Sequence, residues 1–600
     1  MAKSLSQKLI RIMNDKPQKP WQESVKSPAK YFGWFGVVIS CALLICGCAL
    51  FLLTAPWKSE NYGGITAIIW IVLIAAEVTL AVFVAREFLR NFRRFFFALV
   101  CLATFIGLVY AEEDLRGWLT WSHFKRDWEA KGINFDIAGV APAPVAGDKN
   151  FALTPIAYSG YGFILTRDGK RIPNAQRDTN FVQRLRMPIT VEHFREPEHW
   201  LGNWQLGQFS DLQVMQKYYR DAAAKTNEFA VPATPQSPGA DILLALGKYD
   251  ATIEELRAAS VLPESRFPLE YDYDDPGEIL LPHLAALKQC SEVLQLRCLA
   301  ELANGQNQKA TDDLKLMLQL TGKVKTEPFL ISHLVRIAML QMAFQPLWEG
   351  LARHQWTDSQ LVALDGELAK IDFAEAYVRA MKGELAMQHG EINYLRRNPG
   401  RLPDLLNARF SNDGWIDNAI LGLLGRVVPT GWSYQNEYRS ARLMVNYFIP
   451  VANEEQGTFS PDLGEQGSVV LMQETKSPSP FNFIEGRMLP ALTRASLRFA
   501  FAQASVNMAR IALALEHYRL AHGDYPAALA KLAPDDIQEL PQDVIGGQPL
   551  KYRREADGLF TLYSVGWNKT DDGGVFAFRA ENSARPDLEK GDWVWRYPAK

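Results

Sequence analysis

The 600-residue sequence predicts a mainly α-helical membrane protein with about three N-terminal transmembrane helices, an irregular helical array and a small C-terminal α+β module. Three observations support this fold class. Long apolar runs lie within the first 111 residues, helical periods of apolar residues dominate the middle, and a long amphipathic helix followed by strand patterns ends the chain. Apolar residues make up 48% of the sequence, which is enough to fill packed cores.

The charges are distributed unevenly along the chain. Residues 1–111 carry 12 Lys and Arg against 5 Asp and Glu, which leaves 52 against 62 in residues 112–600. A nucleic-acid surface needs clustered Lys and Arg, because binding neutralises phosphates and releases counterions. The mildly acidic remainder therefore predicts no nucleic-acid partner.

The N-terminal part reads as a basic cytoplasmic tail, residues 1–30, followed by a membrane domain, residues 31–111. Expected spans are about 31–53, 64–85 and 95–111. The first run has no charged residue, and at about 1.5 Å per residue it can cross a hydrocarbon core of about 30 Å. The third run is shorter but wholly apolar. The lipid bilayer is thus the first expected partner.

The charges beside the runs predict the orientation. Three acidic residues, 112–114, follow the third run, and four arginines lie between the second and third: Arg86, Arg90, Arg93 and Arg94. Basic loops stay cytoplasmic, so three spans would export residues 112–600, to the periplasm if the membrane is a bacterial inner membrane. Two alternatives remain: a cleaved signal peptide, and a third run that does not insert and leaves the body cytoplasmic.

Glu77 lies inside the second expected span. A carboxylate in hydrocarbon is costly, so it would be protonated or face another helix, which makes it a candidate intramembrane functional residue. The alternative is a carboxyl group that only holds the helices together, hydrogen-bonded to Thr104 or Ser40.

Residues 112–239 form a juxtamembrane segment. Its helix, 112–131, is rich in aromatic side chains that suit the lipid headgroup layer or pack on the soluble body: Trp118, Trp121, Phe124 and Trp128. Residues 161–172 predict a hairpin that turns at Asp168 and Gly169.

Residues 240–397 predict a helical array. Apolar residues from Leu330 to Leu351 form one broad stripe on a long helix. One helical hairpin around Gly305 resembles a single tetratricopeptide-like unit. Its two helices are expected at residues 296–304 and 308–320. No repeat period of about 34 residues follows, so the array is irregular. Arrays of this kind more often bind partners than catalyse, so we expect a protein partner.

Two further segments carry weaker patterns. The acidic loop Glu270–Asp275 could attract a cation or a basic peptide, or could be an ordinary solvated turn. Residues 398–490 contain many glycines and prolines and a polar stretch at 453–466, and predict an irregular connection.

Residues 491–600 predict an α+β module. Apolar positions from Leu497 to Tyr518 alternate in steps of three and four, which indicates a single long helix ending at Gly523. Strand patterns follow at 559–565 and 574–580. The result is a long helix on a small antiparallel sheet.

The C-terminal residues carry a resemblance. The residues that carry it are Tyr518, Gly523-Asp524-Tyr525-Pro526, Pro541, Asp543 and Ser564-Val565-Gly566. At these residues, this part of the chain resembles the globular domain of type II secretion major pseudopilins. The whole chain also resembles an uncharacterised family of bacterial membrane-anchored proteins that combine this ending with a helical middle. The pseudopilin resemblance implies a fold over about a hundred residues, and a fold alone does not carry function.

The same resemblance implies a possible calcium site. The corresponding loop here holds Asn568, Asp571 and Asp572 beside two glycines, and hard cations favour clustered oxygens on such a loop. An ordinary Asp-Gly strand turn explains the same residues. The leader and cleavage site of pseudopilins are absent before the hydrophobic segment, and nearly five hundred residues precede the module, so pilin-like polymerisation is not expected.

The leading functional hypothesis is a membrane-anchored, non-catalytic scaffold or protein-binding protein with a large extracytoplasmic body. The alternative is a membrane-bound enzyme of hydrolase type, whose nearest acid–base candidates are Glu384, His389 and Glu391 on one helix, and His193 with His199. A transporter or sensor that uses Glu77 is a third hypothesis.

Overall fold

The computed structural model describes residues 79, 92–158, 163–165, 171–173, 184–271, 276–401, 428–477, 479, 481–482, 485–556, 558–579 and 582–597. The first two expected spans, 31–53 and 64–85, lie outside these residues except for Thr79, and so does the candidate residue Glu77. The hairpin turn at Asp168 and Gly169 and residues 272–275 of the acidic loop also lie outside them. The described chain is mainly helical, with a small antiparallel sheet region.

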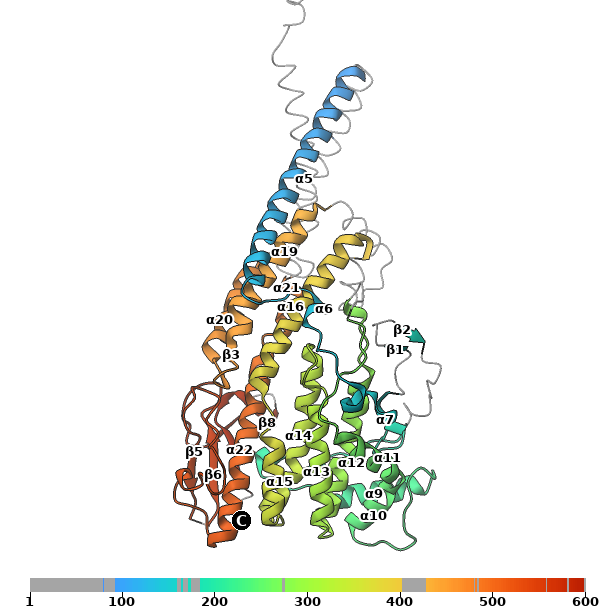
Figure 1. Cartoon of the computed structure of the whole chain (residues 1–600), viewed down its shortest axis with the longest axis vertical. Coiled ribbons are helices and arrows are strands. Elements are labelled where there is room, and N and C mark those ends of the chain that lie inside the picture. The colour runs from blue at the N-terminus through green and yellow to red at the C-terminus, as the bar shows by residue number, and fades with distance from the viewer. Residues whose placement is uncertain are drawn as a thin grey trace, which may run out of the picture. The chain divides into compact units, whose positions relative to one another are not determined.

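The elements follow one another as Figure 1 shows. The helices are α5 (Phe92–Glu129), α6 (Ile137–Val140), α7 (Pro155–Tyr158), α9 (Leu212–Ala223), α10 (Pro238–Leu246), α11 (Asp250–Ser260), α12 (Pro282–Ala303), α13 (Asn307–Gly322), α14 (Leu330–Ala352), α15 (Asp358–Leu368), α16 (Phe373–Arg397), α19 (Thr430–Leu443), α20 (Pro461–Thr475), α21 (Glu485–Met488) and α22 (Ala495–His522). The strands are β1 (Phe163–Leu165), β2 (Arg171–Pro173), β3 (Ala452–Asn453), β4 (Thr458–Phe459), β5 (Lys551–Arg554), β6 (Phe560–Ser564), β7 (Phe576–Arg579), β8 (Asn582–Gly591) and β9 (Trp593–Trp595).

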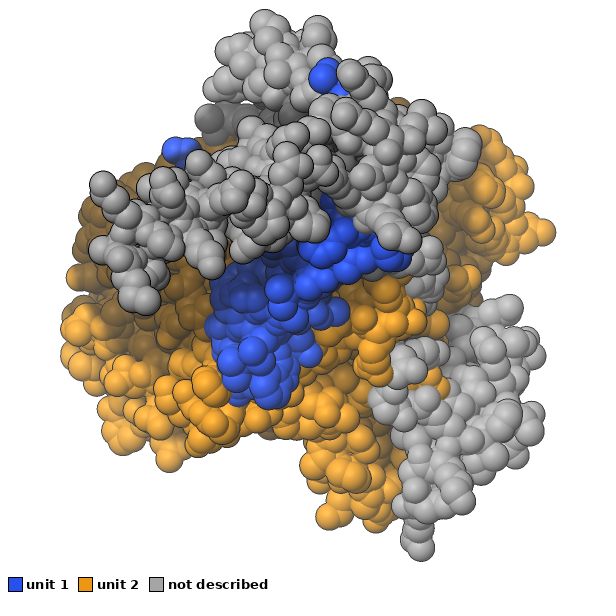
Figure 2. Space-filling model, turned by 90° about the horizontal axis from the view of Figure 1, so that it is seen from above, with its two compact units in different colours: residues 1–122, 427–436, 475–483 blue, residues 123–426, 437–474, 484–600 orange. Residues whose placement is uncertain are grey.

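The chain divides into two compact units, coloured separately in Figure 2. Unit 1 comprises residues 1–122, 427–436 and 475–483, and unit 2 comprises residues 123–426, 437–474 and 484–600. Helices α5 and α19 each begin in unit 1 and end in unit 2.

Helix α5 is longer than the span expected at residues 95–111. It continues without a break through the helix expected at residues 112–131, and ends at Glu129. Its acidic residues do not interrupt it, because the Arg116 guanidinium lies 2.6 Å from Glu113 and 3.6 Å from Glu112 on the same face. Such pairs three and four residues apart support a helix.

Helices α10 to α16 form the array of unit 2. Gly305, with a φ of 69°, allows the reversal between α12 and α13, which pack on each other and on α14 (Figure 1). The side chain of Asp372 caps α16 by accepting the N–H groups of Ala374 and Glu375. The apolar stripe of α14 is buried, as its spacing predicts.

The β elements are small. Strands β1 and β2 pair antiparallel, with Ile164 opposite Ile172. In the C-terminal part β5, β6 and β9 form a three-stranded antiparallel sheet, and β7 pairs with β8. The sequence patterns indicate only β6 and β7, because β5, β8 and β9 are rich in charged or aromatic residues rather than alternating ones.

Helix α22 does not belong to an independent module. One side of it packs on β6 and β9, and other sides pack on α14, α15 and α16. Phe499 is fully buried and its ring contacts those of His333, Phe373 and Tyr377. The sequence pattern of α22 shows apolar faces but cannot show that the array covers one of them.

Residues 398–490 are not the irregular connection that the sequence predicts, because they contain α19 and α20. The face that α19 buries is mainly polar, with Ala441 and Leu443 buried only at its end, so no apolar period marks the helix. Its buried side chains include Gln435, Asn436, Glu437 and Ser440. Helix α20 buries only Pro461, Gly467 and Leu471.

Phe499→Ala tests the integration of α22 into unit 2. Removing this fully buried ring should lower the free energy of unfolding by about 3–5 kcal/mol and shift a single cooperative transition of the whole body. Denaturant unfolding of the full chain in detergent measures this change. Leu520→Ala, on the same helix at 44% exposure, is the matched control and should leave the transition unchanged. Independent melting of residues 491–600 would contradict the shared core.

Candidate functional site

The N-terminal part of α5 presents large apolar side chains to its surroundings. Phe97 is 70% exposed, Leu108 64% and Phe105 51%. Among the described residues, α5 is the helix that is long and apolar enough to cross a membrane, and none of its apolar window is buried. Contact of so much apolar surface with water is unfavourable by about 25 cal/mol per Å². By length and composition, this surface suits a lipid environment.

The apolar part of α5 ends where the helix meets α19 within unit 1. The Asp114 carboxylate accepts the backbone N–H of Gly431 at 2.6 Å, at the start of α19. A Cβ on Gly117 would collide with the Gly431 backbone, and one on Gly431 would collide with the carbonyl of Glu113. The two segments therefore touch backbone to backbone, which only glycine permits.

The last turns of α5 belong to unit 2 and meet the cluster around His389. The Nδ1 atom of His389 bonds to the carboxylate of Glu437 on α19, and its Nε2 atom lies 3.2 Å from the Lys125 ammonium. With a hydrogen on Nδ1, the imidazole donates to the Glu437 carboxylate and its Nε2 atom accepts from the Lys125 ammonium, so both contacts are satisfied. Arg396 also pairs with Glu437, whose side chain is 2% exposed. This arrangement fixes the imidazole between two helices.

The other acid–base candidates do not join His389. Glu384 is five residues before His389 on α16 and therefore lies on a different face of the helix. Its Oε1 atom accepts the backbone N–H of Leu330, at the start of α14, at 3.0 Å. Burial raises the pKa of Glu384. Glu391 is partly buried on the same helix. His193 and His199 lie in an exposed loop, both with positive φ.

The loop predicted to bind calcium holds its polar side chains in local hydrogen bonds. Asp571 accepts from the hydroxyl of Tyr563 at 3.0 Å and lies 3.5 Å from the Lys551 ammonium. The Asn568 amide donates to Asp572 at 3.0 Å. Within the described ranges, no group of three His, Cys, Asp or Glu is arranged to hold a metal. The Lys551 ammonium supplies the positive charge beside Asp571, and the calcium site stays a prediction.

Two buried aspartates explain the geometry of this region. Asp543 accepts the Ser564 hydroxyl at 2.7 Å and the Val565 N–H at 3.1 Å. Asp592, 1% exposed, accepts the backbone N–H groups of residues 572 and 574. Burial raises the pKa of both carboxyl groups. These residues position loops, and sequence reasoning missed Asp592.

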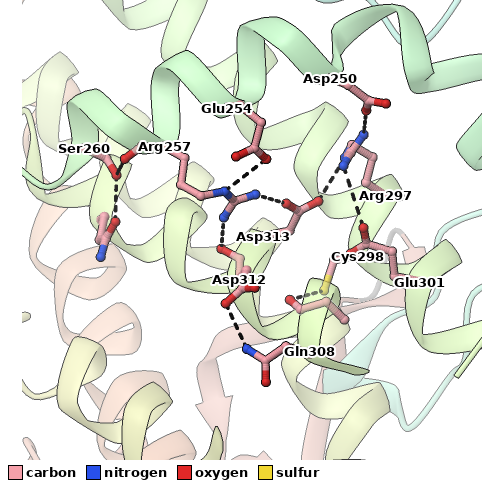
Figure 3. Close-up of polar contacts among 12 residues, drawn as sticks. Asp250, Glu254, Arg257, Ser260, Arg297, Cys298, Glu301, Gln308, Asp312 and Asp313 are labelled. Atoms are coloured by element: carbon pink, nitrogen blue, oxygen red, sulfur yellow. Dashed lines mark hydrogen bonds and ion pairs between the residues drawn. The ribbon is translucent and has the colours of Figure 1, made fainter. Parts of the chain in front are cut away.

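A larger buried charge cluster joins α11, α12 and α13 (Figure 3). Asp313 is 1% exposed, and its carboxylate pairs with the guanidinium groups of Arg257 at 2.6 Å and Arg297 at 2.9 Å. Arg297 also pairs with Asp250. Burial and the charge of Asp313 raise the pKa of Glu301 to about 8. The charged residues of this cluster are spaced along the sequence like those of a solvated helix face. The cluster can therefore be identified only from the packing of α11, α12 and α13.

The two buried thiols of the array are free cysteines. Cys298 lies in the cluster of Figure 3 and donates to the Ala310 carbonyl at 3.2 Å. Burial raises the pKa of the Cys290 thiol to about 12, and it raises that of Cys298 as well. Neither thiol is positioned as a nucleophile, because a nucleophilic cysteine needs a stabilised thiolate.

The polar clusters thus hold helices together. The exposed apolar surface of α5 is the feature that suits contact with lipid, by its length and composition. Comparisons of the chain with protein-family models, with curated proteins and with solved structures find no match.

Gly117→Ala tests the contact between α5 and α19. The added methyl group collides with backbone that cannot move away, so we expect a loss of about 1–3 kcal/mol in stability. Gly107→Ala on the same helix is the matched control, since nothing lies within 4 Å of its Cβ, and it should be neutral or slightly stabilising. Thermal unfolding in detergent compares the two variants. Equal melting temperatures would contradict the close crossing.

Proposed function

We propose that this chain is a membrane-anchored, non-catalytic scaffold or protein-binding protein with its folded body outside the cytoplasm. The observation that carries the proposal is helix α5. Its apolar window is unburied, and the same unbroken helix continues to residue 129, where its last turns contact α16 and α19. A helix of this kind anchors a body to a bilayer without a flexible linker.

The charge pattern supports the orientation. The seven Lys and Arg of residues 1–30 and the four arginines between residues 86 and 94 favour a cytoplasmic location for these segments. The acidic residues 112–114 follow the apolar run and favour the opposite side. In a bacterial inner membrane, this orientation places residues 112–600 in the periplasm.

The side-chain geometry supports a binding role over hydrolysis. Glu384 caps the start of α14 and His389 is fixed between Glu437 and Lys125, so the acid and the base do not face one pocket. We expect the helical array to bind the protein partner, because irregular arrays of helices commonly do so.

Cysteine accessibility tests the anchor and its orientation. Val261 is 76% exposed in unit 2, so Val261→Cys should react with a membrane-impermeant maleimide on intact spheroplasts expressing the chain. Ser4→Cys, in the basic tail, should react only after the membrane is permeabilised. The native chain, which has six cysteines of which Cys290 and Cys298 are fully buried, is labelled in parallel and gives the background that is subtracted from both variants. The reverse labelling pattern would place the body in the cytoplasm.

Complementation separates a scaffold from a hydrolase. In cells that depend on the chain, Glu384→Gln and His389→Ala should restore growth in proportion to the amount of folded protein in the membrane. Both side chains support packing, so their loss acts through stability. A variant that folds and accumulates like the native chain but fails to complement would favour the enzyme instead.

A further inference from the structure

A cavity lies within unit 2 where the start of α14 meets the start of α22. Its volume of about 360 Å³ falls near the lower end of the range of small-molecule sites, about 300–1,000 Å³. Leu330 and Leu334 line it from α14. The other lining residues belong to the turn that leads into α22 and to the first residues of α22 itself. Two helices that are far apart in the sequence therefore form this cavity.

The buried part of the cavity lining is apolar. Leu330 is 8% exposed and Ala495 is 4% exposed, and Leu334 beside them is half-buried. Pro490 and Ala491 complete this part of the lining nearer the surface. None of these five side chains carries a hydrogen-bonding group. The interior of the cavity therefore suits hydrocarbon, because apolar surface gains free energy when it leaves water.

Two arginines line the same cavity at its exposed side. Arg494 and Arg498 are four residues apart, so their side chains leave neighbouring positions on one face of the helix start. Both side chains are exposed, whereas Leu497 and Phe499 between and after them are buried in the core. The burial of these apolar neighbours fixes the first turn of α22 and leaves the two guanidinium groups at the mouth of the cavity.

The charges at the mouth favour an anion with a single negative charge. The guanidinium of Arg494 lies 3.8 Å from the carboxylate of Glu589, and these two side chains are 74% and 53% exposed. So exposed a pair is weak and leaves Arg494 able to bind another group. Within the described ranges, Arg498 has no carboxylate partner. One positive charge is therefore uncompensated, and guanidinium groups bind carboxylates through paired N–H donors.

We propose that this cavity binds a single-chain acyl carboxylate, with the carboxylate held by Arg494 and Arg498 and the hydrocarbon chain packed against Leu330, Leu334 and Ala495. The exposed guanidinium groups meet the charged head, and the buried apolar residues receive the chain. An inorganic anion would leave the apolar lining in water, and an uncharged chain would gain nothing from the arginines. A ligand site of this kind goes beyond an anchoring or scaffold role and does not depend on it.

Photo-cross-linking of the full chain in lipid nanodiscs tests the site. The probe is decanoate with a diazirine group on its chain, and mass spectrometry of peptides locates the label after irradiation. We expect the label in peptides that contain residues 330–334 or 490–498. The methyl ester of the same probe keeps the chain and lacks the charge, so it should label these peptides about five-fold less or weaker still, because charge-assisted hydrogen bonds to the arginines are lost.

Variants then separate the two parts of the site. The double variant Arg494→Gln with Arg498→Gln changes only exposed side chains, so it should fold normally, and its labelling by the acid should fall to the level of the ester. Leu334→Trp narrows the cavity from α14 and should also reduce the labelling. Arg186→Gln is the matched control, since Arg186 is an exposed arginine of unit 2 outside the cavity lining, and it should be labelled like the native chain.

Several results would overturn the proposal. Absence of the label from both peptides, or equal labelling by the acid and the ester, would show that the cavity does not select an acyl carboxylate. Undiminished labelling of the double glutamine variant, with a native melting temperature, would remove the role of the arginines. Inorganic phosphate that displaces the probe as effectively as unlabelled decanoate would show a site for a free anion, in which the apolar lining has no part.

Discussion

The burial of α22 is the constraint on which most of unit 2 depends. A helix of 28 residues with apolar side chains on nearly every face cannot be covered by a small sheet alone. The sheet covers one side through β6 and β9, and α14, α15 and α16 cover the rest. The helical array and the C-terminal strands consequently share one core. Trp204, at the start of a short 3₁₀ helix (Trp204–Leu206), adds to this core, because its ring contacts those of Phe344 and Trp595.

Buried charge is the second organising feature. Asp313 holds two arginines among α11, α12 and α13, Glu437 holds His389 and Arg396 between α16 and α19, and Glu516 accepts from Tyr525 at 2.9 Å and lies the same distance from His354. Each cluster connects elements far apart in the sequence. Because breaking one member of such a pair leaves an uncompensated buried charge, these clusters make the arrangement of helices specific.

The sequence predicted the mainly helical fold, the helices of the array and the long helix that ends at Gly523, because each depends on a local period or cap that neighbouring residues determine. It did not predict α19, whose buried face is mainly polar, or the packing of α22 on α14, α15 and α16, which lie far from it in the sequence. For the candidate site, spacing placed Glu384 and His389 on one helix but could not show that they face different neighbours. The cluster around Asp313 was missed, because each of its charges, taken alone, resembles a charge on a solvated helix face. The apolar run of α5 was found, because its apolar residues are continuous along the sequence.

The two buried thiols of the array have a practical consequence for handling the protein. A thiol exchanges with a disulfide only as its thiolate, and a raised pKa keeps the thiolate fraction of Cys290 and Cys298 very small at neutral pH. Once folded, the body resists disulfide scrambling and oxidation at these positions. Burial therefore protects these two thiols, whereas Cys101 on α5 is only partly buried.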